Sequence, residues 1–452
     1  MSFSNIIVKN NSLTFDIDNI DKSLVNAIRR ISISEIPTIA FKTEPITEND
    51  INIIVNKSSL HNEFLSHRIG MTPIHIHEND VDTYEYNNNY TFILDINNDT
   101  DEIIEVTTED FKIKKLNGLF LSKSEVKKIF PPDRITGDYM IITRLKPDIT
   151  GNKQGERIHI EAKAIKETGL KNARWSPVET CSYNFKRDKR EGMEQYKIEI
   201  AKINDLKKTN NVPILSKKEE EEILRQSEIH NFDRYYMKDN FGEPNSFECR
   251  LISINLSPVY IIRKAMTILI ERLYFIKNEL ENEESKIIEI VDCDNKNIRK
   301  CVDIIIKNES HTLGNLLQSY INIYSNNYNS TMVQVDMVGY KCPHPLEKKL
   351  ILRVKPTMNT DDEDYRNISK NIVLKTCDNL ISLIYALITD WNNKQTTQET
   401  EESQDPEEPD KPDEKKDIFK EYNEDYKKVE PEKEKEKEQE KEKKKLKSKV
   451  KK

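Results

Sequence analysis

The chain is poor in glycine and cysteine and has no long apolar run. Its 452 residues include only 10 glycines, and none of them forms a glycine-rich phosphate loop. The six cysteines contain no CxxC pair, so we expect reduced thiols. No apolar run approaches the roughly 20 residues that cross a bilayer, and the first residues show no basic and apolar leader. These absences favour a protein of the cytosol or nucleus.

Motifs of catalysis are missing as well. The sequence has no HExxH helix, no GxSxG elbow and no Asp-x-Asp-x-Asp run of the kind that holds catalytic magnesium. The nearest approach to a metal site is His75 with His77, which would share one strand face. Upstream histidines at 61 and 67 could complete a ligand set, but histidines on an exposed strand are more often polar surface. We predict no catalytic residue, no metal and no cofactor.

What the sequence does contain is an internal echo. Residues 21–30 (Asp-Lys-Ser-Leu-Val-Asn-Ala-Ile-Arg-Arg) resemble residues 310–319 (Ser-His-Thr-Leu-Gly-Asn-Leu-Leu-Gln-Ser). In both copies a hydroxyl residue, Ser23 or Thr312, is a predicted N-cap for a short helix with one apolar face. A duplicated module predicts a dimer built within one chain.

The flanking elements repeat in the same order. An alternating strand precedes each helix, at residues 13–17 and 302–306, and a second strand is expected after each, at 39–41 and 333–337. The second copy then returns directly through residues 341–348 into an alternating strand. The first copy reaches its matching strand only near residues 247–256, so the intervening segment is predicted to contain an added domain.

Each half ends in a long amphipathic helix. The two apolar stripes step by threes and fours, which is the pattern of helix packing on helix. A stripe of this kind could also simply cover its own sheet. We expect both: each helix covers its sheet and meets the other helix. The stripes are Ile262, Ala265, Leu269, Leu273, Ile276 and Leu280 in the first half and Val373, Cys377, Leu380, Ile384, Leu387 and Trp391 in the second.

Residues 393–452 form a separate segment. They begin acidic and end in a lysine-rich stretch, with almost no apolar content to bury. We expect disorder, although alternating Glu and Lys at 432–440 could support a solvated helix. The net charge of −8 gives the whole chain no attraction to nucleic acid, so any such contact would be local.

Several of these segments resemble RNA polymerase alpha-type subunits. Residues 23–37 (Ser-Leu-Val-Asn-Ala-Ile-Arg-Arg-Ile-Ser-Ile-Ser-Glu-Ile-Pro) are similar to the first helix of the bacterial alpha subunit and of the third-largest subunit of eukaryotic RNA polymerase II. Residues 66–73 (Ser-His-Arg-Ile-Gly-Met-Thr-Pro) and 173–178 (Ala-Arg-Trp-Ser-Pro-Val) resemble later segments of that subunit. The second half is similar to its small partner subunit through residues 309–317 and 339–347.

The resemblance implies an α+β fold with two alpha-subunit N-terminal-type dimerisation modules in one chain. It implies a fusion of subunits that normally pair as a heterodimer, of the archaeal D plus L type, as in large DNA viruses. The expected activity is that of a non-catalytic platform which holds the two largest polymerase subunits, in a virion and viral factory if the chain is viral. The predicted segments are the first part of module 1 (1–46), an inserted β-rich domain (47–184), the second part of module 1 (185–280), a linker (281–300), module 2 (301–392) and a disordered tail (393–452).

The resemblance also assigns residues. Arg29 and Arg30 are expected to contact the second-largest subunit, and His67, Arg68 and Trp175 are further partner-binding candidates. A structural histidine, a surface cation and a buried indole are the respective alternatives for the last three. Gly314 would allow a close approach of its helix. The intramolecular dimer interface is predicted at Leu24, Ile28, Leu269, Leu273, Leu313, Leu317, Leu380 and Ile384.

In one respect the sequence departs from its relatives. Eukaryotic members carry a cysteine-rich zinc loop in the inserted domain and some archaeal members an iron–sulfur site, but no cysteine precedes Cys181 here. Two other functional classes remain as alternatives. One is an independent homodimer that binds nucleic acid through its basic tail, and the other is a metal enzyme built on the four histidines. Residues 185–245 are charged and aperiodic, and the sequence suggests no role for them.

Overall fold

The structure is a computed structural model of the whole chain. It describes residues 1–84, 90–148, 155–282, 284–293, 298–325, 333–357 and 364–402. Residues Met1–Lys394 form one compact unit, which contains both copies of the echo. The prediction of a disordered tail falls mostly on residues 403–452, outside the described part of the chain.

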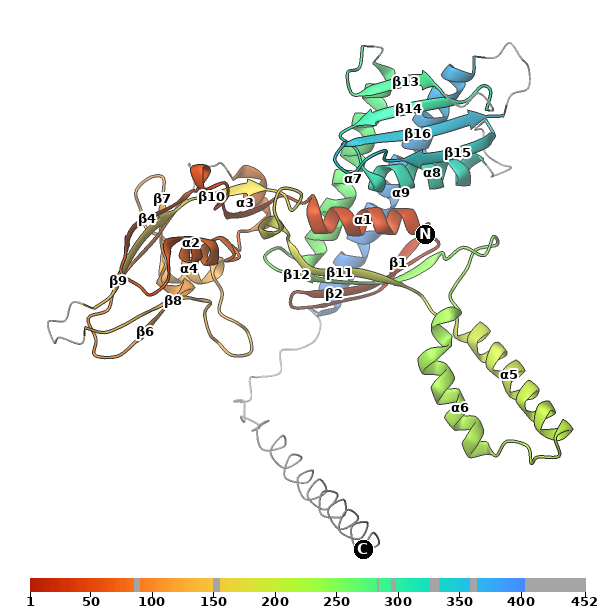
Figure 1. Cartoon of the computed structure of the whole chain (residues 1–452), viewed down its shortest axis with the longest axis horizontal. Helices are drawn as coiled ribbons and strands as arrows, with labels where there is room; N and C mark the ends of the chain where they lie inside the picture. The colour runs from red at the N-terminus through yellow and green to blue at the C-terminus, as the bar shows by residue number, and fades with distance from the viewer. Residues whose placement is uncertain are drawn as a thin grey trace, which may run out of the picture. The chain divides into compact units, whose positions relative to one another are not determined.

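The first module is an antiparallel four-stranded sheet with two helices (Figure 1). Alternate residues of its second strand, Leu13, Phe15 and Ile17, are buried, as the period of two predicts. Its helices are α1 (Lys22–Ser34) and α7 (Pro258–Glu281). In sheet order its strands are β1 (Ser2–Lys9), β2 (Ser12–Asp18), β12 (Ser246–Ser253) and β11 (Val178–Phe185).

The second module repeats this arrangement strand for strand. Its helices are α8 (His311–Ser325) and α9 (Tyr365–Glu402). In both modules the first helix follows the second strand of the sheet, and the long helix follows the return strand. The duplication predicted from the short echo therefore extends to the topology. In sheet order the strands are β13 (Ile288–Asp292), β14 (Val302–Lys307), β16 (Lys349–Pro356) and β15 (Val335–Lys341).

One predicted strand match and three predicted boundaries need correction. The strand β3 (Thr38–Phe41) is not the counterpart of β15, because it pairs with β10 (Ala164–Glu167) in a separate ribbon. The counterpart is β11, so the inserted domain ends before Val178 and not at residue 184. The predicted linker 281–300 contains β13, the first strand of the second sheet. The last helix also continues past residue 392, to Glu402.

The caps of the two short helices lie two residues earlier than predicted. The side chain of Asp21 accepts the backbone N–H of Ser23 at 2.8 Å and caps α1. At α8 the hydroxyl of Ser310 accepts the N–H of Thr312 at 3.5 Å. Ser257 caps α7 ahead of Pro258, as the sequence indicates. The side chain of Thr312 is therefore free of the capping role and can make a different contact.

The inserted domain is mainly β, as expected. It packs its helices on a sheet of β4 (Ile51–Asn56), β9 (Arg157–Ala162), β5 (Tyr90–Asn97) and β7 (Lys112–Lys115). A smaller ribbon joins β6 (Ile104–Thr107) to β8 (Ile141–Leu145). The helices are α2 (Asn62–Gly70), α3 (Glu78–Thr83) and α4 (Lys123–Ile129), and the short 3-10 turns are η1 (Ile46–Glu48), η2 (Thr108–Asp110) and η3 (Ala173–Trp175).

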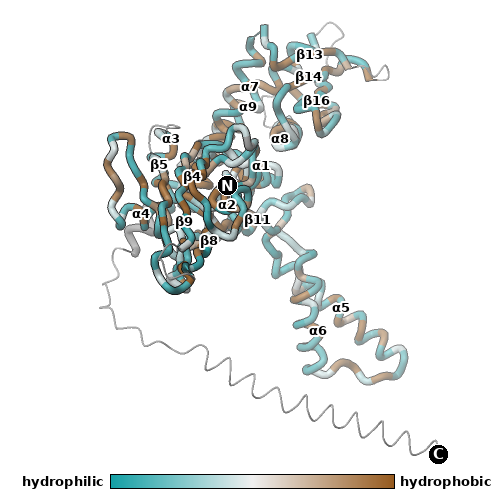
Figure 2. Tube along the Cα trace, turned by 60° about the vertical axis from the view of Figure 1, so that its left-hand side comes forward, coloured by the Kyte–Doolittle hydropathy of each residue, from teal (hydrophilic) through white to brown (hydrophobic). Residues whose placement is uncertain are grey.

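A helical hairpin fills the region for which the sequence suggested no role. It consists of α5 (Lys189–Thr209) and α6 (Lys217–His230), followed by the short turn η4 (Phe232–Arg234). The two helices contact each other and share a half-buried apolar seam, while brown apolar segments recur along them in Figure 2. Only Gly192 of α5 and Ser227 of α6 are fully buried. The hairpin thus adds little to the main core.

One continuous apolar core joins the two modules. It runs from Phe3 in the first strand to Trp391 in the last helix and includes both sheets. A segment of α9 is long and apolar enough to resemble a membrane span, at Tyr365–Gln395. Its apolar stripe from Val373 to Trp391 lies in this core, and the core helix of a globular protein meets the same test. We therefore interpret α9 as a core helix.

Candidate assembly interface

The helix α1 lies between the two modules. It packs against α7 of its own module and against α8 of the second module. Leu24 of α1 and Leu313 of α8 are both fully buried. The predicted interface residues are all buried in the shared core: Leu24, Ile28, Leu269, Leu273, Leu313, Leu317, Leu380 and Ile384.

The long helices α7 and α9 also join the two modules. Lys277 of α7 forms an ion pair of 2.7 Å with Asp378 of α9, as the prediction that the helices meet requires. Toward its end, α9 reaches the first module's sheet, where the Asp390 carboxylate accepts the backbone N–H of Phe3 at 2.8 Å. The indole of Trp391 lies edge-on to Phe3, with ring centroids 4.8 Å apart. The last helix therefore covers a sheet made by the first residues of the chain.

A buried ionic cluster also crosses between the modules. Arg272 of α7 donates to Glu35, the residue that ends α1, and lies 3.4 Å from Glu309, which precedes α8. Their side chains are only 20%, 10% and 12% exposed. Burial lowers the pKa of Arg272, but the two carboxylates outweigh it and the pKa is raised overall. Burial raises the pKa of Glu309, which Arg272 only partly offsets.

The two arginines of the echo point to different partners. Arg29 is half-buried, and its guanidinium donates to the side chain of Asn26 at 3.0 Å, one turn back on α1. Arg30 is exposed, yet its Nε donates to the hydroxyl of Thr312 on α8 at 2.7 Å. Arg30 therefore takes part in the contact between modules, a role that the sequence analysis did not assign to it.

At the end of α2, one of the two predicted partner-binding residues is already bonded within the chain. Arg68 is exposed, and its guanidinium donates to the carbonyl oxygens of Ile141 and Ile142 at 2.7 and 2.9 Å, at the start of β8. His67 beside it is exposed. A Cβ at Gly70 would lie 2.5 Å from the Thr43 side chain, so a larger residue does not fit there. Of this segment, His67 is best placed to meet a partner.

Trp175 has to be removed from the partner-binding residues. Its side chain is 3% exposed, and its indole N–H donates to the carbonyl of Ile165 at 3.2 Å. The backbone carbonyl of Trp175 accepts the hydroxyl of Thr38 at 2.8 Å. The indole therefore anchors η3 against the ribbon of β3 and β10, which was the alternative that the sequence left open.

Of the four histidines considered as metal ligands, three bond to the backbone, and the fourth, His67, is exposed. His61 and His77 accept backbone N–H groups at the starts of α2 and α3. His75 bridges two parts of the chain, with one ring nitrogen 3.2 Å from the Ile129 carbonyl and the other 3.0 Å from the Ile254 carbonyl. Within the described residues, no group of three or more His, Cys, Asp or Glu side chains is arranged to hold a metal.

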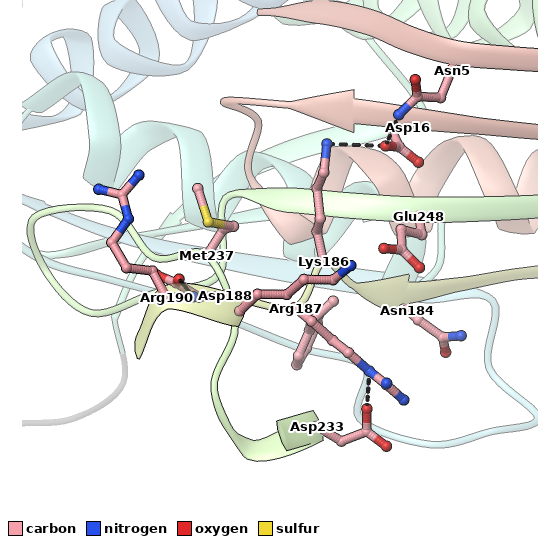
Figure 3. Close-up of a pocket in the computed structure, with 12 residues that line it drawn as sticks. Asn5, Asp16, Asn184, Lys186, Arg187, Asp188, Arg190, Asp233, Met237 and Glu248 are labelled. Carbon is pink, nitrogen blue, oxygen red and sulfur yellow. Dashed lines mark hydrogen bonds and ion pairs between the residues drawn. The ribbon is translucent and has the colours of Figure 1, made fainter. Parts of the chain in front are cut away.

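A cavity of about 1160 Å³ lies at the base of the helical hairpin (Figure 3). Lys186 points to Asp16 across it, at 3.0 Å, and Arg187 is paired with Asp233. Its lining holds equal numbers of cationic and acidic side chains. The cavity therefore offers neither a strong net charge for an ion nor a nucleophile with a base.

A family model identifies the chain. The model described as the RNA polymerase Rpb3/Rpb11 dimerisation domain matches residues 14–273, more than half of the 452 residues. The chain belongs to this family. A second model with the same description matches residues 301–389. The two matches fall on the two modules seen in the fold.

The curated relatives each match only part of the chain. It is 30% identical over 185 residues to the DNA-directed RNA polymerases I and III subunit rpac1 of Dictyostelium discoideum, which is 39% of this chain and 49% of that protein. It is 26% identical over 197 residues to the DNA-directed RNA polymerase subunit Rpo3 of Methanosphaera stadtmanae, 42% of this chain and 61% of that one. A conjugation stage-specific protein of Tetrahymena thermophila is 30% identical over 173 residues, 36% of this chain and 53% of that one. The chain spans about half the length of the curated relatives it matches.

The sequence analysis missed the ionic cluster at the interface and, elsewhere in the chain, the helical hairpin. The ionic cluster brings together residues far apart in the chain, and no local pattern marks it. The helical hairpin did leave signals: Asp188 caps α5, and Ser216 with Glu219 forms a capping box at the start of α6. A serine followed three residues later by a glutamate is a recognised helix start.

Proposed function

We propose that this protein is a non-catalytic platform subunit of a multisubunit DNA-directed RNA polymerase. In this proposal, the chain is a heterodimer fused in cis that holds the two largest catalytic subunits together. The observation that carries it is the pair of matched modules on one polypeptide, joined by a single core. The polymerase names of the relatives and the family of both modules support the same function.

The fusion changes how the platform forms. When both modules are on one chain, their association is intramolecular, at an effective concentration of millimolar order for a short linker. The segment between α7 and β13 is short, running from residue 282 to residue 287. Assembly of the polymerase would then begin from one folded chain, with no prior encounter of two subunits.

We assign the partner contacts to surface that the module interface leaves open. Arg29 and the exposed His67 are the candidates, since a planar guanidinium can hold a carboxylate or carbonyl of a large subunit. Arg29 is bonded to Asn26 of its own helix, and Arg30 and Arg68 are bonded to other elements of the chain. Their contribution to a partner surface would have to come from the remaining guanidinium nitrogens.

Affinity purification from the native source tests the platform. The expected result is recovery of the two largest polymerase subunits in stoichiometric amounts, together with RNA synthesis activity. Their absence from a monodisperse preparation of the tagged chain would refute the proposal. Arg29→Glu should reduce their recovery, with exposed Lys197→Glu on the helical hairpin as the control.

A viral source remains part of the proposal. If the chain belongs to a large DNA virus, the polymerase would lie in the viral factory of the host cytoplasm and in the virion. Otherwise it would lie in the nucleus or cytosol. Imaging of the tagged chain during infection, together with analysis of purified particles, distinguishes these locations.

A further inference from the structure

The two modules are alike, but the charges at their interface are not. At one end of the interface, Arg272 of the first module meets Glu309 of the second, and Glu35 completes the cluster. All three side chains are at most one-fifth exposed. A buried charge is tolerated only where it is paired, because the protein interior does not solvate it. This end of the interface therefore depends on bringing unlike residues together.

Each member of the cluster has a counterpart in the other module. Leu24 of α1 aligns with Leu313 of α8, and by this alignment Ile20 takes the place of Glu309 and Tyr324 takes the place of Glu35. The buried stripes of α7 and α9 align Leu273 with Ile384, which puts Leu383 in the place of Arg272.

The counterpart residues are apolar or aromatic and belong to the same core. Ile20 is 2% exposed, and Tyr324 and Leu383 pack against the core. One end of the pseudo-symmetric interface is thus ionic and the other is apolar. A pair of two first modules would bring Arg272 against Ile20 but would leave it paired with Glu35 of its own module. A pair of two second modules would bring Glu309 against Leu383.

We propose that Glu309, through Arg272, determines which modules pair, because the unlike pair gives Glu309 a cation whereas a pair of two second modules would bury it against Leu383. The proposal rests on the cis heterodimer of the proposed function. Specificity of this kind comes from the cost imposed on the wrong pairs, and it does not require that the cluster stabilise the right one. The cluster would oppose the joining of two copies of the chain through their second modules.

A chain that is cut after folding tests this. A protease site is placed at residue 283, between α7 and β13, in the full-length protein. Two preparations with different tags on the second module are folded, cut, mixed and left to exchange. Capture of one tag and detection of the other counts pairs of second modules, and detection of first modules from the other preparation counts unlike pairs. In the wild type, unlike pairs should exceed like pairs by at least about tenfold.

Two variants make the ends of the interface alike. The triple change Arg272→Leu, Glu309→Ile and Glu35→Tyr copies the apolar end onto the ionic end. The reverse triple change copies the ionic residues onto the apolar end, through Ile20→Glu, Tyr324→Glu and Leu383→Arg. Either variant should raise like pairs to the level of unlike pairs. Lys277→Leu is the control, since it removes a more exposed ion pair between the same helices and should leave the ratio unchanged.

The outcomes separate the inference from the function on which it rests. Like pairs at the wild-type level in a folded symmetrised variant would overturn the inference. So would a loss of thermal stability in the single change Arg272→Leu no larger than that in Lys277→Leu, a comparison that holds even if a triple variant fails to fold. Cut wild-type fragments that separate on dilution without re-pairing would instead contradict the cis heterodimer itself.

Discussion

At the scale of single residues, the chemistry of a side chain is easier to predict from sequence than the partner that it binds. Arg30 and Trp175 were both assigned to partner surfaces by resemblance, but in the structure both are bonded within the chain, the exposed Arg30 to Thr312 and the buried Trp175 to Ile165. An arginine or indole has the chemistry for a docking surface and also for an internal bond. Which of the two it makes depends on neighbours that are distant in sequence.

Glu309→Gln should change the pH dependence of stability. Burial raises the pKa of Glu309 above its unfolded value of 4.5, so the folded state binds this proton more tightly than the unfolded state. Its stabilising contribution is full below the unfolded pKa and is lost as the pH rises through the folded pKa. At pH 7.5 the Gln variant should therefore unfold at the same or a higher denaturant concentration than wild type. The difference should vanish toward about pH 4.5.

The control for this titration is Glu289→Gln. Glu289 pairs with Lys307 at the surface, and that hydrogen bond lowers the pKa of Glu289, so the sign of its pH dependence is opposite. A Glu309→Gln variant that unfolds at a lower denaturant concentration than wild type at neutral pH would contradict the raised pKa of Glu309.

Gly314→Ala should destabilise the second module. A Cβ there would lie 2.5 Å from the ring of Tyr340 and 2.6 Å from the Leu350 side chain, so α8 would have to move away from its sheet. Overpacking of this kind costs about 1–3 kcal/mol. Gly339→Ala is the matched control, because nothing lies within 4 Å of its Cβ. Equal unfolding midpoints for the two variants would show that α8 is not pressed against β15.

At the scale of elements, the sequence predicted what local pattern specifies. The alternating strand of Leu13, Phe15 and Ile17 and the apolar stripes of the long helices were correct, because burial on one face gives each a fixed period. The match of β3 to β15 was wrong. Both are short strands after a helix, but strand pairing is set by partners across the sheet. For the true counterpart, β11, that partner is distant in sequence, since Phe185 lies opposite Phe247.

Removal of the helical hairpin should leave the modules folded. Replacing residues 189–230 by a short glycine and serine linker deletes α5 and α6 but keeps the paired ends of β11 and β12, where Phe185 lies opposite Phe247. The deletion removes the contact of Gly192 with Phe232 and the packing of α6 on η4. We expect the thermal midpoint to stay within about 4 °C of the full chain. A larger fall, seen by differential scanning calorimetry, would mean that the hairpin supports the sheet.

At the scale of the whole molecule, the family and the two-module plan were predictable and the joint between modules was only partly so. The eight apolar interface residues could be named from the sequence because each falls on a helical stripe. The ionic cluster could not, since Glu35, Arg272 and Glu309 come from three separate parts of the chain. Long-range pairs of this kind have no period to reveal them.

Two truncations should behave differently. A chain ending at residue 402 retains Lys394, which donates to the Phe3 carbonyl and pairs with Asp390 at 3.3 Å. A chain ending at residue 392 loses that contact. The first should unfold like the full protein, and the second should lose about 1 kcal/mol, the typical net value of such a bond. Lys394→Met in the longer chain should reproduce the loss. The sequence alone predicts that deletion of residues 393–452 leaves folding intact, and aggregation of the longer chain would contradict that prediction for residues 403–452.

The hydrogen bond from the backbone N–H of Phe3 to Asp390 joins residues 387 positions apart. On a ribosome that adds about 5–20 residues per second, the first strand would wait roughly 20–80 s for the helix that covers it. Throughout that time the side of the first strand that α9 covers would remain open to other nascent chains. In the proposed cis heterodimer, a delay in synthesis would thus take the place of a search for a partner subunit.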